Sequence, residues 1–402
     1  MKYLDQIDKK EIDLNHLSSN DNLDILITGD FAPINSIEEL CKNNNYHEIY
    51  DDFLWILKNK DLSITNLETP LTTKLNPIKK RGSNLVANPI CTKGIRYGGF
   101  DIATLSNNHI YDYGELGLLD TIKACNDISI KTVGAGKNIK EARQPLYIDI
   151  KGKKIAILNF SEHEFSIAEE NKAGSNPLDP FENYYQVLEA KSKSDITIVI
   201  VHGGNELYPL PSPRIIKNYH FLADLGVTAI IGHHPHCASG FEIYKGVPIF
   251  YSLGNFIFDL AGQKESWYEG YFIKLKINNN SPKKITLFPY YQCKNKTGLS
   301  LMNNEEEKQF LNKIKDYSKI IIDNDLLKEN WIKFCDSKKI TYLSKLLSYN
   351  VLKKQIIKKN LFSKLIINEK NLLLLLNLVR CEAHREVIIE ILNSIINKKD
   401  TG

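Results

Sequence analysis

Short apolar segments alternate with longer helical patterns along much of the chain, and this alternation constrains the fold most. The apolar segments span residues 24–28, 62–65, 100–105, 155–160, 196–201, 227–231 and 247–252. Between them, apolar residues recur three and four positions apart, as at Leu116, Leu119 and Ile122, which is typical of helices that lie on a sheet. Because the segments are continuously apolar, we expect an α/β fold whose strands are covered on both faces.

Polar side chains follow these segments where each predicted strand ends. The candidates are Asp30, Glu68, Asn108, His202, His234 and His236. Open α/β sheets bind their ligands at the carboxyl ends of the strands. We therefore expect the six side chains to converge on one sheet edge. Each is weak evidence by itself, since a Gly-Asp pair is a common turn and a lone histidine is more often structural than a ligand.

Carboxylate, imidazole and amide ligands in one place favour a site for transition metals. Such a mixed set suits Mn²⁺, Fe²⁺, Zn²⁺ or Co²⁺ better than Mg²⁺ or Ca²⁺, which prefer shells made almost entirely of oxygen. Two such ions about 3.5–4 Å apart would polarise a substrate oxygen and supply hydroxide near neutral pH. The sequence thus predicts a site for two divalent metal ions.

The order of the motifs and their amino-acid sequences resemble those of a known family. The motifs are GD at 29–30, NLETPLT at 66–72, SNNHIYDYG at 106–114, GLLDT at 117–121, VGAG at 133–136, HGGNE at 202–206, GHHPH at 232–236 and YSLGNF at 251–256. Together they resemble the CapA family of capsule and poly-γ-glutamate biosynthesis proteins, within the calcineurin-like metallophosphatases. The resemblance implies a layered α/β/β/α domain.

The resemblance also implies roles for individual residues. Glu68 would bridge two metals, one held by Asp30 and His236 and the other by Asn108, His202 and His234. His109 would be the catalytic acid, oriented by Asp112, while Asn66, Glu206 and Asn255 would orient ligands or contact substrate. His233 is set aside, because in a strand it would point away from His234 and His236. The calcineurin-like pattern places a histidine two positions after Asp30, where this chain has Ala32, so one metal is expected to bind weakly.

The chain is predicted to divide into three parts. Residues 1–22 form an N-terminal extension, residues 23–295 the CapA-like metallophosphatase domain, and residues 296–402 a helical C-terminal domain with helical periodicity at 342–347, 351–357 and 387–396. The apolar run at 372–376 is too short to cross a membrane and predicts a buried helix. Lysine-rich faces in this region are typical of solvated helices, with a protein or membrane-surface partner as the alternative.

Composition limits the remaining classes of function. A formal net charge of +4 does not provide the concentrated positive field that nucleic-acid binding requires. The seven cysteines are scattered without a C-x-x-C pair, which favours a reducing compartment. No hydrophobic segment opens the chain, although anchored members of the family have one, so we expect a cytoplasmic protein.

The hypothesis is a metal-dependent hydrolase, phosphoesterase-like, acting on a small-molecule or polymer substrate in capsule or poly-γ-glutamate biosynthesis. The alternative is a non-catalytic assembly or polymer-binding factor.

Overall fold

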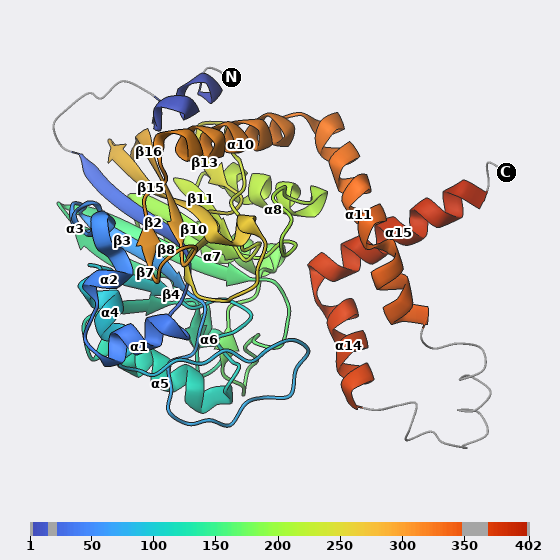
Figure 1. Ribbon diagram of the computed structural model, residues 1–402, viewed down its shortest axis with the longest axis horizontal. Helices are drawn as coiled ribbons and strands as arrows, with labels where there is room; N and C mark the ends of the chain where they lie inside the picture. Colours follow the sequence, from blue (N-terminus) through green and yellow to red (C-terminus); the bar gives the residue numbers. More distant parts are fainter. Residues whose placement is uncertain (1–2, 15–21, 348–368, 400–402) are drawn as a thin grey trace.

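The computed structural model describes residues 3–14, 22–347 and 369–399, and the predicted helical segment 351–357 lies outside them. Within this part of the chain, two large sheets form the core (Figure 1). The nine-stranded sheet contains β1 (Glu11–Asp13), β2 (Leu23–Ala32), β3 (Leu62–Leu67), β4 (Ile102–Thr104), β5 (Lys131–Val133), β14 (Asn255–Phe258), β15 (Glu269–Asn278), β16 (Ser281–Gln292) and β17 (Leu299–Ser300). The strand order is β1-β16-β15-β2-β3-β4-β5, with β14 beside β2 and β17 beside β16.

The second sheet has six strands in the order β12-β13-β11-β10-β8-β7. These are β7 (Leu146–Ile150), β8 (Lys153–Ser161), β10 (Ile196–His202), β11 (Ala229–His233), β12 (Phe241–Tyr244) and β13 (Val247–Phe250). The strands β8, β10, β11 and β13 pair in parallel, as do β2, β3, β4 and β5 in the first sheet. A two-stranded ribbon pairs β6 (Ala135–Gly136) with β9 (Gly174–Ser175).

The two sheets pack face to face, and helices cover their outer faces. Ile25 and Ile27 of the first sheet share one buried cluster with Ile198 and Ile200 of the second. Outside the first sheet lie α1 (Ser36–Lys42), α2 (His47–Tyr50), η2 (Asp51–Phe53), α3 (Leu54–Lys58), α4 (Cys91–Tyr97) and α5 (Gly114–Asn126). Outside the second lie α7 (Pro180–Ser192) and α8 (Pro213–Asp224), and the short helices α6 (Ile139–Ala142) and α9 (Glu265–Tyr268) complete the domain. The predicted layered α/β/β/α fold is confirmed.

The C-terminal region is helical, as predicted, and its last three described helices pack on the outer side of the second sheet. Its described helices are α10 (Asn304–Ile322), α11 (Asn324–Leu347), α14 (Glu369–Arg380) and α15 (Glu382–Lys399). Trp331, Leu378 and Val387 join the cluster that also contains strand residues of β10 and β11. The run at 372–376 is helical, but Leu372 and Leu376 are 48% and 41% exposed, so the expectation of a buried helix is wrong for this face. No helix in the described ranges is long and apolar enough to span a membrane.

Contacts cross both of the predicted domain boundaries. Near the N-terminus, η1 (Leu4–Lys9) leads into β1, which pairs antiparallel with β16 and so extends the first sheet. Lys10 forms an ion pair with Glu307 of α10, whose buried side chains join the core between the sheets. The division at residues 22 and 295 therefore stays a prediction about independent folding, and the described segments form one packed body.

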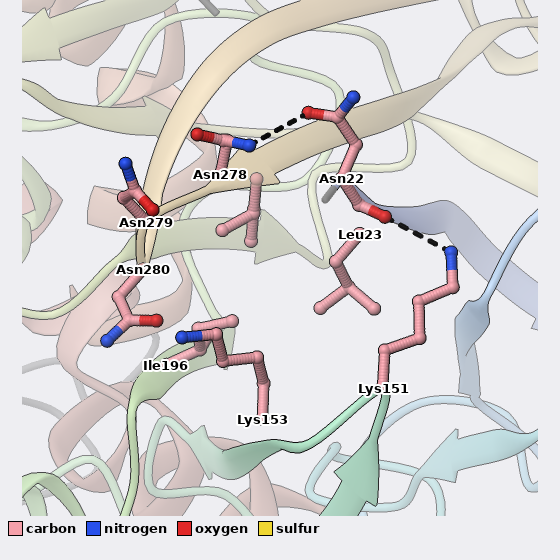
Figure 2. A pocket seen from close by; sticks show the side chains of 9 residues that line it. Asn22, Leu23, Lys151, Lys153, Ile196, Asn278, Asn279 and Asn280 are labelled. Carbon is pink, nitrogen blue, oxygen red and sulfur yellow. Dashed lines mark hydrogen bonds between the residues drawn. The ribbon is translucent and has the colours of Figure 1, made fainter. Parts of the chain in front are cut away.

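A small cavity lies at the end of the sheets where the parallel strands begin, opposite to their carboxyl ends (Figure 2). It is lined by residues such as Leu23, Ile196 and Lys153, and Lys151 donates a hydrogen bond across it to the Asn22 carbonyl at 3.1 Å. Its volume of about 20 Å³ suits roughly one water molecule. This cavity is therefore too small for a substrate.

We expect substitution of Trp331 to reveal whether the helical region folds together with the sheets. Trp331 is 4% exposed beneath the site-facing loop that carries Tyr208, so Trp331→Ala should cost about 3–5 kcal/mol of unfolding free energy. Ile340 on the same helix is 84% exposed, and Ile340→Ala should change stability by less than about 0.5 kcal/mol. Chemical denaturation would measure both, and equal effects of the two substitutions would contradict the packing described.

Candidate metal centre

The six predicted ligands come from two sheets. Asp30 lies in β2, Glu68 directly follows β3 and His202 ends β10. Asn108 follows β4, while His234 and His236 follow β11. The expectation of one sheet edge is thus wrong in detail, because the carboxyl ends of the parallel strands of both stacked sheets meet at the same end of the sandwich. The convergence itself is as expected.

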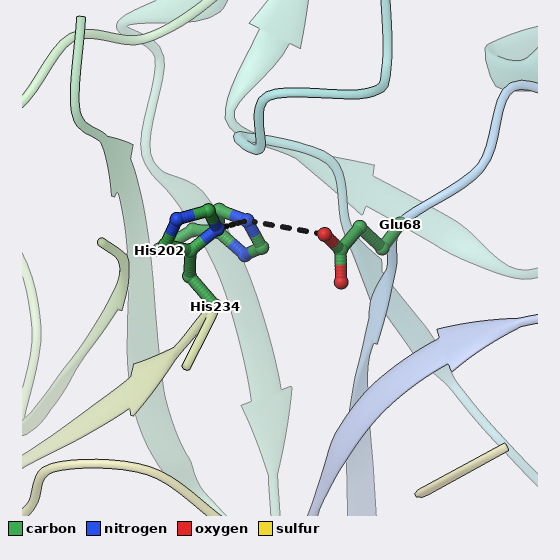
Figure 3. A group of neighbouring side chains, drawn as sticks. All are labelled: Glu68, His202 and His234. Carbon is green, nitrogen blue, oxygen red and sulfur yellow. Dashed lines mark hydrogen bonds and ion pairs between the residues drawn. The ribbon is translucent and has the colours of Figure 1, made fainter. Parts of the chain in front are cut away.

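The charged and imidazole ligands gather in two groups that share Glu68. One group is Asp30, Glu68 and His236, and the other is Glu68, His202 and His234. Within each group, one ligand atom per residue lies within 4.8 Å of the others, and every residue is buried. Figure 3 shows the carboxylate of Glu68 pointing at the rings of His202 and His234, with Glu68 Oε1 3.4 Å from His202 Nε2. Asn108 Oδ1 lies 3.0 Å from the same Nε2 atom.

Glu68 carries a buried carboxylate that the described residues leave without hydrogen bonds. Its side chain is fully buried, and among the described residues neither carboxylate oxygen has a hydrogen-bond partner. Burial raises the pKa of Glu68 well above its ordinary value, and the nearby Asp30 carboxylate raises it further. Buried carboxylates are normally paired or bound to metal. The two free oxygens between imidazoles therefore fit a bridging ligand.

Asp30 is, in contrast, held from several sides. Asn66 Nδ2 donates to its Oδ1 at 2.7 Å, and the backbone N–H of His234 donates to its Oδ2 at 3.2 Å. His233 Nδ1 lies 3.2 Å from Oδ1. Burial acts to raise the pKa of Asp30, but the imidazoles of His233 and its neighbours outweigh this and lower it, so the carboxylate stays ionised.

His202 and His234 are kept neutral by their surroundings. Burial lowers the pKa of His202 well below its ordinary value, and lowers the pKa of His234 to about 4. A neutral imidazole keeps the lone pair that a metal requires. Asn66 Nδ2 lies 3.1 Å from His202 Nδ1, so the same amide that binds Asp30 also contacts this ring.

The backbone after β11 departs from a strand. His234 and His236 have φ angles of 97° and 55°, which place both in the left-handed half of conformational space. Residues without glycine's freedom occupy this region at a cost, and such positions cluster at functional sites. The alternation used to set His233 aside therefore does not hold. His233 faces Asp30, a contact that the sequence analysis missed because it assumed an extended GHHPH segment.

Asn255 orients His236. His236 Nδ1 lies 2.9 Å from Asn255 Oδ1, which can only accept, so this ring nitrogen carries the proton. The Asn255 amide is itself fixed by donating to the Trp267 carbonyl at 3.2 Å. His236 Nε2 is then free to act as a ligand, 3.7 Å from Glu68 Oε1.

His109 and Asp112 lie beside the ligands as a hydrogen-bonded pair. His109 Nδ1 donates to Asp112 Oδ2 at 2.7 Å, which leaves Nε2 free. Lys80 completes the group, because its Nζ forms an ion pair with Asp112 Oδ1 and lies 3.2 Å from His109 Nδ1. Burial lowers the pKa of His109, and the Lys80 charge lowers it further against the opposing effect of Asp112. Sequence reasoning missed Lys80, which lies in a loop without any strand-end signal.

The loop that carries Lys80 is organised around Asp112. The backbone N–H of Leu85 donates to Asp112 Oδ2 at 2.7 Å, and the N–H of Ile78 donates to the Asp112 carbonyl at 2.9 Å. Asn84 Nδ2 donates to the same carbonyl at 3.0 Å. One buried carboxylate and its backbone thus position both His109 and the 78–85 loop.

The helical region reaches the loops that flank the centre, which the sequence did not predict. Asn205, next to the exposed Glu206, donates from Nδ2 to the carbonyl of Ala383 in α15 at 3.2 Å. His163, in the loop after β8, contacts Glu382 at 2.8 Å through Nδ1. Arg214 of α8 forms ion pairs with both Glu162 and Glu386. The start of α15 is therefore fixed beside the two loops.

Comparisons with known proteins agree with the motifs. Residues 24–260 match the family model of the bacterial capsule synthesis protein PGA_cap. A capsule biosynthesis protein CapA of Bacillus anthracis is 32% identical over 289 residues, 66% of this chain and 70% of that protein. A PGA biosynthesis protein CapA of Bacillus subtilis (strain 168) is 31% identical over 245 residues, 60% of this chain and 64% of that protein. A 5'-nucleotidase structure from Candida albicans aligns over 78% of this chain and 59% of its own, with a TM-score of 0.39 and 12% identity.

The buried ion pair beside His109 should dominate the stability of this region. The side chains of Lys80 and Asp112 are 4% and 1% exposed, so Lys80→Gln would leave a buried carboxylate without its cation. We expect a loss of about 3–5 kcal/mol in unfolding free energy.

Lys79 is the matched control, because its side chain is 75% exposed and its ion pair lies at the surface. Lys79→Gln should cost less than about 1 kcal/mol. Urea denaturation monitored by circular dichroism would measure both. If the two variants were equally stable, Lys80 would not be paired as described.

Proposed function

The chain belongs to the bacterial capsule synthesis protein PGA_cap family, and on that premise we propose that it is a metal-dependent, phosphoesterase-like hydrolase in capsule or poly-γ-glutamate biosynthesis. One observation carries the proposal most. Glu68 is fully buried, neither of its carboxylate oxygens has a hydrogen-bond partner among the described residues, and it lies between two sets of side chains that could each complete a metal site. The names of the two Bacillus relatives support the biosynthetic setting.

The proposed ligand sets follow the two groups in the structure. Asp30, Glu68 and His236 would hold one divalent ion, and Glu68, Asn108, His202 and His234 the other. Such donors favour Mn²⁺, Fe²⁺ or Zn²⁺, and these ions when bound supply an activated water and neutralise developing charge on the substrate. The first set has fewer ligands, since Ala32 carries no donor atom, so we propose that its ion binds more weakly.

His109 is the proposed proton donor to the leaving group. Its Nδ1 proton is held by Asp112, which leaves Nε2 as the atom that exchanges a proton with substrate. Because burial and Lys80 lower the pKa of His109, its protonated form is a stronger acid than ordinary histidine. Such an acid supports a hydrolase over a non-catalytic assembly factor, which would have no use for a positioned proton donor.

Metal content tests the bridging role. We expect purified protein supplied with Mn²⁺ or Zn²⁺ to bind two equivalents by elemental analysis, and Glu68→Ala to lose both, since its carboxylate would neutralise both ions. Glu329→Ala, which removes an exposed carboxylate of α11, should keep both. Two equivalents retained without Glu68 would refute the bridge, and an unmodified protein that binds no metal would favour the assembly-factor alternative.

Measurement of turnover tests the proposed role of His109 as proton donor. A panel of phosphomonoesters, phosphodiesters and γ-glutamyl peptides would identify a substrate, and on that substrate His109→Ala should lower kcat by about a hundredfold or more with metal content unchanged. His47→Ala, at an exposed position on α2, should have normal kcat. Loss of metal in His109→Ala would make His109 a ligand instead, and an unchanged kcat would remove it from the mechanism.

A further inference from the structure

A cavity of about 370 Å³ opens between the 78–82 loop and the first turn of α14. Four of its lining residues are basic, namely Lys79, Lys80, Arg81 and Lys370, and one is acidic, Glu369. The cavity is therefore formed jointly by the family domain and the helical region, and positive charge dominates its wall.

The charges of this cavity are only partly compensated by the protein. Lys80 is paired with Asp112, and Lys79 Nζ is paired with Glu369 at 2.8 Å. For Arg81 and Lys370, no ion pair or hydrogen bond is made to any other residue in the described ranges. Both side chains belong to exposed residues. Two cationic groups thus remain available to an anion that enters the cavity.

Lys80 connects this cavity to the metal centre. It lines the cavity, while its Nζ lies 3.2 Å from His109 Nδ1. The segment that presents Lys79 and Arg81 is held in place by the hydrogen bond that the Ile78 N–H donates to the Asp112 carbonyl. The cavity therefore adjoins the candidate centre on the Nδ1 side of His109, where Lys80 and Asp112 form their buried ion pair.

We propose that this cavity is an anion-binding subsite next to the metal centre and takes a carboxylate or phosphate group of an extended anionic chain. The planar guanidinium of Arg81 matches either anion with paired hydrogen bonds. Glu369 already places a carboxylate on Lys79, which shows that this wall accepts such a group. Single exposed ion pairs contribute little, so the subsite would favour chains that carry several anionic groups in sequence. The proposal rests on the proposed function for the identity of the neighbouring site, but binding requires no turnover.

Calorimetric titration tests the subsite directly. The probes are a γ-linked glutamate octamer and an inorganic polyphosphate of similar length, added to the full chain with and without Mn²⁺. We expect Arg81→Gln and Lys370→Gln each to weaken binding about twofold to fivefold and to reduce its salt dependence. Lys217→Gln, which removes an exposed lysine of α8, is the charge-matched control and should bind as the unmodified protein does.

A substitution that is expected to tighten binding provides a second test. Glu369→Gln releases Lys79 from its internal partner, so binding should tighten by about twofold to fivefold. The probe that binds more tightly identifies the anion as carboxylate or phosphate. Failure of both probes to bind, or equal weakening by Lys217→Gln, would overturn the subsite. A protein that binds a probe through Arg81 and Lys370 but hydrolyses no member of the panel would overturn the proposed reaction alone.

Discussion

The candidate centre is organised around the buried carboxylate of Glu68. An ionised carboxylate without partners costs several kcal/mol inside a protein, so it must gain either a proton or a cation. The proposed metal site corresponds to the second outcome, and it is supported by Asp30, which is held ionised, and by His202 and His234, which are held neutral. A neutral imidazole and an ionised carboxylate both keep a lone pair that can bind a cation.

Hydrogen bonds behind the ligands set their orientation. Asn66 contacts both Asp30 and His202, and Asn255 fixes the ring of His236. Both amides belong to the first sheet and are fully buried, so the packing around them leaves little freedom for rotation. The same principle extends to His109 through Asp112 and Lys80. Ligands that are positioned by the core in this way lose little conformational entropy when an ion binds.

The helical region contributes to the surroundings of the centre through polar and aromatic contacts. Arg214 and Glu386 join α8 to α15, while Tyr208 stacks on Phe334 of α11 with ring centroids 4.0 Å apart. The family match ends at residue 260, so these helices lie beyond the matched part of the chain. The cavity beside Lys80 exists only because α14 is held next to the 78–82 loop.

The sequence by itself determined the α/β class, the positions of most strands and the six candidate ligands, because strand ends and local motifs are set by nearby residues. It could not show that two sheets supply those ligands, since stacking depends on contacts between distant segments. For the same reason it misplaced the buried face of α5, where Leu118 is buried and Leu116 is 58% exposed. The turn at His234 brings His233 onto Asp30, and Lys80 reaches His109 from a loop that no periodic pattern marks. Only the tertiary structure decided these contacts, because left-handed backbone and long-range ion pairs depend on the packing around them.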